Sequence, residues 1–134
     1  MKNKINAITA SDLMTHGILS VEPGASVQEA VDLMVKSRIG SVVVLSPIQD
    51  LIGIFTERDL LYRVVGASKN PKTTKIDEVM TRNVMVAQAT DGAWDLVQVM
   101  NREKFRHLPV VDGRKVIGIL SIKDFTDSLL QNFG

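Results

Sequence analysis

The sequence contains no cysteine, and this absence excludes several classes of protein at once. Disulfide frameworks, thiolate metal sites and cysteine nucleophiles all need that side chain. An excess of charge of one sign is lacking too, because 16 basic residues nearly balance 15 acidic ones and leave a formal net charge of +1. We therefore expect neither nucleic-acid binding nor association with an anionic membrane surface.

Long apolar runs are also missing. Nowhere do about 18 apolar residues follow one another, and the first eight residues lack the apolar run of a secretory signal. We therefore expect a soluble protein that is not exported, and the lack of cysteine favours the cytoplasm. The length of 134 residues and the hydrophobic content of 45% suit one compact globular unit or two very small ones.

Catalytic motifs are scarce as well. The two histidines, His16 and His107, have no metal-ligand spacing, and no Gly-x-Ser-x-Gly, Gly-x-Gly-x-x-Gly or Gly-Lys-Ser/Thr motif occurs. The sequence thus favours a binding protein over an enzyme, without a protein metal site or a catalytic cofactor. A magnesium ion would arrive only together with a nucleotide.

What the chain does contain is an internal repeat. The segment 12–15 (Asp-Leu-Met-Thr) returns as 78–81 (Glu-Val-Met-Thr), 66 residues later, and 41–45 returns as 107–111 at the same offset. After one deletion in a turn the offset is 65. Residues 53–59 (Gly-Ile-Phe-Thr-Glu-Arg-Asp) then match 118–124 (Gly-Ile-Leu-Ser-Ile-Lys-Asp). Two copies of one unit fill nearly the whole chain.

Each copy predicts the element order strand, helix, strand, strand, helix. In the first copy, Ser26 and Glu29 form a capping-box signal before a helical apolar pattern, and 42–45 and 51–55 are short apolar runs typical of buried strands. Thr56 caps a second helix, which Gly66 ends. In the second copy, Asp91 or Gly92 caps a helix, strands occupy 108–111 and 116–120, and Asp112-Gly113 makes the turn between them.

These units are too small to bury both faces of a three-stranded sheet alone. We therefore predict a mixed α/β (α+β) fold in which two β-α-β-β-α repeats pack through their sheets with an approximate two-fold axis. The predicted organisation is repeat one at 10–66, a polar, lysine-containing linker at 67–75 and repeat two at 76–134.

The repeated motifs resemble a tandem pair of cystathionine-β-synthase (CBS) domains, known as a Bateman module. The resemblance covers about residues 10–130 and rests on Met14-Thr15, 40–44, 53–59 and their counterparts in the second copy. It implies a regulatory module without catalysis. Such modules bind AMP, ADP, ATP or S-adenosylmethionine in clefts between the copies, often form homodimers, and control a partner protein.

The paired Thr/Ser-x-x-Asp motifs are the candidate ligand site. A carboxylate can accept hydrogen bonds from both ribose hydroxyls, while a hydroxyl and the first helical N–H groups can hold a phosphate. The alternative is that both motifs are simple helix caps. The resemblance implies one cleft with Asp124, Ser121, Ile119, Met14, Ile18, Leu19 and Gly40, and another with Asp59, Thr56, Ile54, Met80, Val84 and Met85. For the apolar members, ordinary core packing is the alternative.

Two further features separate the copies. Arg106 and His107 precede a strand where similar proteins place phosphate-binding residues, whereas the first copy has Gly40 and Ser41 there. We therefore expect the two clefts to differ in affinity or preferred ligand. Trp94, the only tryptophan, indicates either a dimer interface or local packing. The main hypothesis is an adenosine-ligand sensor, and the alternative is a scaffold that keeps the fold but binds no ligand.

Overall fold

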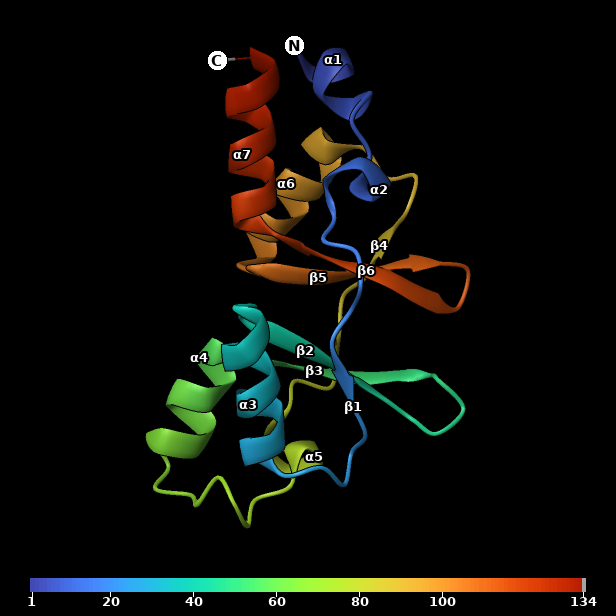
Figure 1. Cartoon of the computed structure of the whole chain (residues 1–134). Helices are drawn as coiled ribbons and strands as arrows, with labels where there is room; N and C mark the ends of the chain where they lie inside the picture. Colours follow the sequence, from blue (N-terminus) through green and yellow to red (C-terminus); the bar gives the residue numbers. More distant parts are fainter. Residues whose placement is uncertain (134) are drawn as a thin grey trace. The chain divides into compact units, whose positions relative to one another are not determined.

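The computed structural model describes residues 1–133, except for the side chain of Phe133, and shows a mixed α/β protein with two three-stranded sheets (Figure 1). The chain divides into two compact units. One unit is Leu19–Val84, and the other combines Met1–Ile18 with the segment from Met85 onward. The mixed α/β class predicted from the sequence is therefore confirmed.

The Leu19–Val84 unit is built on the sheet β1-β2-β3. Strand β1 (Ser20–Val21) runs parallel to β2 (Ser41–Leu45), and β3 (Leu51–Thr56) runs antiparallel to β2. All five residues of β2 are buried, as a run rich in valine requires. Helix α3 (Val27–Ser37) begins at Ser26, whose Oγ accepts a hydrogen bond from the Glu29 N–H at 3.1 Å.

The last helix of the first repeat departs from the predicted regular helix. A single turn, α4 (Glu57–Asp59), leads into a π-helix, η1 (Leu60–Val65). The Gly66 N–H donates to the Leu61 carbonyl at 2.7 Å, which is a bond across five residues. The predicted start at Thr56 and end at Gly66 are correct, but the apolar pattern carried no sign of the wider turn.

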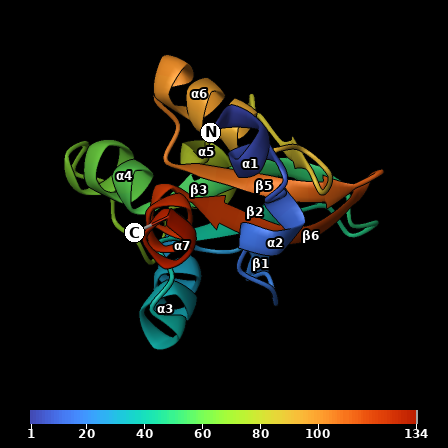
Figure 2. The ribbon, with the colours of Figure 1, turned by 90° about the horizontal axis from the view of Figure 1, so that it is seen from above.

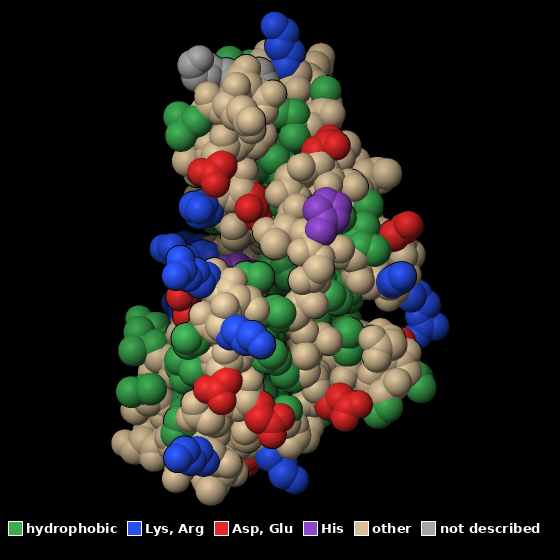
Figure 3. Space-filling view, in the orientation of Figure 1, with side chains coloured by type: hydrophobic (Ala, Val, Ile, Leu, Met, Phe, Trp, Pro, Cys, Tyr) green, Lys and Arg blue, Asp and Glu red, His purple; other side chains and the backbone are tan. Residues whose placement is uncertain are grey.

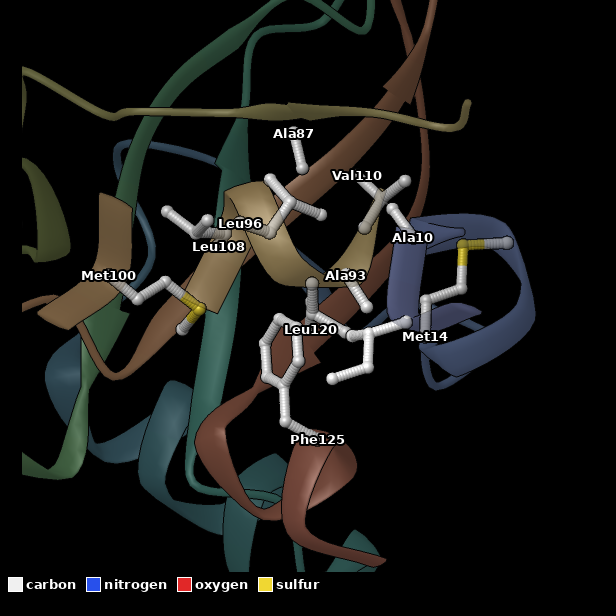
Figure 4. Close-up of a cluster of buried hydrophobic side chains, with 11 residues drawn as sticks. Ala10, Met14, Ala87, Ala93, Leu96, Met100, Leu108, Val110, Leu120 and Phe125 are labelled. Carbon is white, nitrogen blue, oxygen red and sulfur yellow. The ribbon is translucent and has the colours of Figure 1, made fainter. Parts of the chain in front are cut away.

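The other unit repeats this plan with the sheet β4-β5-β6. Strand β4 (Ala87–Gln88) is parallel to β5 (His107–Asp112), and β6 (Lys115–Ser121) is antiparallel to it. Helices α6 (Ala93–Glu103) and α7 (Ile122–Phe133) complete the repeat, with Gly92 as the cap of α6. The predicted turn is present, and Gly113 supplies its positive φ of 64°. Leu96, Leu108, Leu120 and Phe125 meet in the buried core of this unit (Figure 4).

The short segment that leads into each repeat packs with the other repeat. Helix α2 (Ala10–Leu13) belongs to the unit of β6, whereas helix α5 (Ile76–Val79) belongs to the unit of β3. The chain before α2 forms an additional helix, α1 (Lys2–Asn6), which packs against α6 (Figure 2). Asn6 and Asp95 exchange two hydrogen bonds of 3.2 Å there. Helix α1 has no counterpart in the repeat, so the repeat did not predict it.

Candidate functional site

The two Thr/Ser-x-x-Asp motifs form helix caps in both repeats. Oδ2 of Asp59 accepts hydrogen bonds from the Thr56 N–H at 3.0 Å and from the Thr56 hydroxyl at 3.3 Å. Oδ2 of Asp124 accepts the equivalent bonds from Ser121 at 2.7 and 3.1 Å. Each hydroxyl in turn accepts from the aspartate N–H, at 3.3 Å for Thr56 and 3.4 Å for Ser121. The capping role is therefore real, and any ligand role is additional to it.

The amides at the start of these two helices are bonded within the chain. The Glu57 N–H donates to the Gly40 carbonyl at 3.0 Å, and the Ile122 N–H donates to the Arg106 carbonyl at 3.2 Å. Together with the caps, these bonds occupy the first and third amide of both helices. A phosphate therefore cannot bind these amides without displacing partners that the chain already supplies.

The glycine that opens each motif makes room for a methionine from the leading segment. A Cβ on Gly53 would lie 2.4 Å from Sδ of Met80, and a Cβ on Gly118 would lie 2.4 Å from Sδ of Met14. Both methionines are buried, at 3% and 8% exposure, which supports the packing interpretation for their side chains. The following threonine pairs with the motif strand, Thr81 with Ile54 and Thr15 with Ile119.

The two aspartates differ in how much of the carboxylate is in use. Oδ1 of Asp59 accepts a hydrogen bond from the Thr81 hydroxyl at 3.1 Å and lies 3.5 Å from Nε of Arg63. Asp59 is buried, with 6% of its surface exposed. Asp124 is only partly buried, and Oδ1 of Asp124 takes no hydrogen bond from the residues that the structure describes.

Asp124 also lines a groove of about 410 Å³ between α2 and α7. That volume falls within the usual range for small-ligand pockets, about 300–1,000 Å³. The remaining residues that line it are polar or acidic, apart from Ile8 and Leu13; they are Asp12, Asp127, Ser128, Gln131 and Asn132. Of the predicted site residues, only Asp124 lines this groove.

The structure groups the predicted site residues by unit. Asp59 shares a unit with Met80, and Asp124 shares one with Met14. The Leu19–Val84 unit also contains Leu19, Gly40, Ile54, Thr56 and Val84, and the other contains Ile18, Met85, Arg106, His107, Ile119 and Ser121. Leu19 and Met85 pack against the apolar cores of their own units.

The basic residues of the second repeat lie beside the start of α7. His107 is the register partner of Ser121, and Arg106 is exposed next to it. In the first repeat the corresponding register pair is Ser41 and Thr56. Lys123 lies in an exposed pair with Asp127 at 3.8 Å.

Trp94 packs against the core of its unit together with Ile5 and Ile8 of the N-terminal segment. This contact supports the local-packing interpretation rather than the interface.

Sequence analysis missed two residues that contact Asp59, namely Arg63 and Thr81. Thr81 belongs to the Met-Thr pair that occurs in both repeats, and this repetition could have marked it as a site residue. Arg63 corresponds to Ser128 in the second repeat, so the repeat gave no indication of its role.

Ser41 is the one buried side chain among the described residues whose hydroxyl has no hydrogen-bond partner. It is 1% exposed at the start of β2. A buried unsatisfied polar group costs about 1–3 kcal/mol, so we expect Ser41→Ala to raise the free energy of unfolding by about 1 kcal/mol. Urea denaturation measures this change.

The control for this prediction is Ser46→Ala. The Ser46 hydroxyl accepts a bond from the Asp50 N–H at 3.1 Å, so its removal should lower stability instead. A loss of stability in Ser41→Ala as large as that in Ser46→Ala would show that the Ser41 hydroxyl has a stabilising partner.

Comparison with known proteins settles the family. The CBS-domain profile matches residues 10–66 and 76–131. The chain belongs to the CBS-domain family. Its two CBS domains form a tandem pair, as in a Bateman module, and CBS pairs of this kind are regulatory modules. None of the helices within residues 1–133 is long and apolar enough to cross a bilayer, and these residues contain no cluster of three or more metal-binding side chains.

Similar proteins agree with this assignment. The chain is 33% identical over 114 residues to the CBS domain-containing protein CBSCBSPB2 of Arabidopsis thaliana, covering 85% of this chain and 21% of that protein. A proposed signal-transduction protein with CBS domains from Burkholderia ambifaria has a TM-score of 0.88 at 30% identity, covering 94% and 96% of the two chains. The hexameric CBS-CP12 protein of bloom-forming cyanobacteria has a TM-score of 0.84 at 27% identity, covering 94% and 75%.

Proposed function

We propose that this CBS pair is a regulatory sensor, without catalysis, that binds an adenosine-containing ligand: AMP, ADP, ATP or S-adenosylmethionine. The observation that carries the proposal is the Asp124 carboxylate. Its Oδ2 is bonded to Ser121, its Oδ1 takes no hydrogen bond from the described residues, and Asp124 lines a groove. The module consists of repeats 10–66 and 76–134 joined by the linker 67–75, and it acts in the cytoplasm.

The chemistry of the neighbouring residues supports such a ligand. A fixed carboxylate suits the two hydroxyls of a ribose, because both can donate to it. The exposed Arg106 provides positive charge near Ser121, and the apolar Ile119 belongs to the same unit. The ligand class follows from the shared adenosine, and a bound ATP would bring its magnesium ion with it.

Thermal or chemical unfolding with and without ligand tests the sensor. A ligand at 100 times its dissociation constant adds about 2.7 kcal/mol to the free energy of unfolding. We expect AMP, ADP, ATP or S-adenosylmethionine to produce a shift of this size, whereas guanosine monophosphate serves as the control. If none of the four adenosine compounds shifts unfolding at saturating concentration, the sensor hypothesis is wrong.

A second candidate function, a ligand-free interaction scaffold, is favoured by exposed apolar side chains. Leu61, Tyr62 and Val65 of η1 are 56%, 65% and 61% exposed, and apolar groups are visible on the surface over this helix (Figure 3). Such a face suits a second copy of the chain or a regulated partner protein. A homodimer is part of our main proposal. In the scaffold alternative, self-association measured by light scattering would occur without any effect of adenosine compounds.

A further inference from the structure

Asp59 and Asp124 differ in how many hydrogen-bond partners their carboxylates have within the chain. We infer that Asp124 is the ligand-accepting aspartate, whereas Asp59 is kept closed by an internal latch formed by Asp59, Arg63 and Thr81. This inference rests on the proposed function, because it states which of the two candidate sites binds the adenosine ligand.

The latch occupies the acceptor that a ligand would need. The Thr81 hydroxyl donates to Oδ1 of Asp59 at 3.1 Å, which is the kind of bond that a ribose hydroxyl would make. Because Oδ2 is already bonded to Thr56, both oxygens of Asp59 have partners from the chain. A ribose hydroxyl must therefore compete with Thr81 and Arg63 for Oδ1 of Asp59.

Arg63 strengthens the latch from the other side. Its Nε lies 3.5 Å from Oδ1 of Asp59, and its Nη1 donates to the carbonyl of Met80 at 2.9 Å. The guanidinium thus connects η1 to Met80, at the C-terminal end of α5. Thr81 follows Met80 in the chain and is held against Asp59 by the same contact. Asp59 is 6% exposed as a result, although the neighbouring Arg63 side chain is 51% exposed.

The second repeat lacks both parts of the latch. Thr15, the counterpart of Thr81, keeps the backbone pairing with Ile119 but is exposed, and its hydroxyl makes no bond to Asp124 among the described residues. Ser128 stands where the first repeat has Arg63. Asp124 is consequently more exposed than Asp59 and lines the groove between α2 and α7.

The charges at the start of helices α4 and α7 also differ between the two repeats. The first residue of α4 is Glu57, whose carboxylate lies beside Gly40; a Cβ on Gly40 would be 2.6 Å from its Oε1. The first residue of α7 is the uncharged Ile122, and its N–H donates to the backbone carbonyl of Arg106. A phosphate near Asp59 is repelled by Glu57, whereas the corresponding first position of α7 carries no acidic side chain.

AMP binding to the full chain, measured by calorimetry, tests the latch. In Asp124→Asn the remaining AMP affinity belongs to the latched site and is weak. Adding Arg63→Met and Thr81→Val to Asp124→Asn should strengthen AMP binding by about tenfold, because two competing interactions are removed and tenfold corresponds to about 1.4 kcal/mol. Thr81→Val alone in that background, which keeps Arg63 and the pairing with Ile54, should give a smaller gain.

Thr15→Val in the Asp124→Asn background is the matched control, and it should give no gain. The latch is overturned if the folded triple variant binds AMP no better than Asp124→Asn, or if Thr15→Val gives an equal gain. It is also overturned, while the sensor stands, if AMP affinity survives in Asp124→Asn and is lost in Asp59→Asn. If the wild-type chain binds neither AMP nor the other adenosine compounds, the proposed function itself fails.

Discussion

Asp124→Asn is expected to weaken AMP binding by about 100-fold, or about 2.7 kcal/mol. Hydrogen bonds to a charged acceptor contribute about 1.5–3 kcal/mol each, and an amide keeps only one acceptor oxygen. Ser121 donates two hydrogen bonds to Oδ2 of Asp124. If the asparagine oxygen keeps its hydrogen bonds from Ser121, the asparagine NH₂ group faces the ribose hydroxyls. These hydroxyls would donate to the carboxylate of the wild-type aspartate. Calorimetric titration with AMP measures the change.

Asp112→Asn is the matched control for this prediction. Asp112 is an exposed aspartate at the end of β5, and its replacement removes the same charge without touching the start of α7. AMP affinity should stay within about twofold, since a surface charge is largely screened by solvent. An affinity of Asp124→Asn equal to that of Asp112→Asn would show that Asp124 does not bind the ligand.

The strands and the two long helices α3 and α6 could be predicted because their patterns are local and occur in both repeats. The run of valines in β2 and the capping residue Ser26 each act over a few neighbouring residues. The second repeat supports the assignments made in the first, because the helix that follows Gly92 has the same length as the helix that follows Ser26. Predicted strand and helix boundaries therefore agree with the structure to within one or two residues.

The difference between the two aspartates could not be predicted in the same way. Both lie in the same local motif and make the same capping bonds, so no short window of sequence distinguishes them. What separates them is a contact 22 residues away in the chain, from Thr81 to Asp59, and a side chain on the next helical turn, Arg63. The fold is thus a consequence of local pattern, whereas the availability of the site depends on tertiary contacts that the repeat does not share.

Phe55→Ala is expected to have the largest effect on stability. Phe55 is fully buried near the end of β3, opposite the equally buried Val42, and its removal leaves a cavity among Val44, Val64 and Ile76. Phenylalanine-to-alanine changes of this kind lower the free energy of unfolding by about 3–5 kcal/mol. A total stability of about 5–15 kcal/mol is typical, so such a loss is a large fraction of it. Urea denaturation followed by circular dichroism measures it.

Two further variants serve as comparisons for Phe55→Ala. Ile48→Ala, at a side chain that is 79% exposed in the turn before β3, should change stability by no more than about 0.5 kcal/mol. Leu120→Ala, at the buried counterpart of Phe55 in β6, should lower it by about 2–5 kcal/mol. Comparable losses at Phe55 and Leu120 would show that both repeats depend on the same strand position for their cores, because each position packs its own unit. A loss at Phe55 no larger than that at Ile48 would mean that β3 does not hold the core of its repeat.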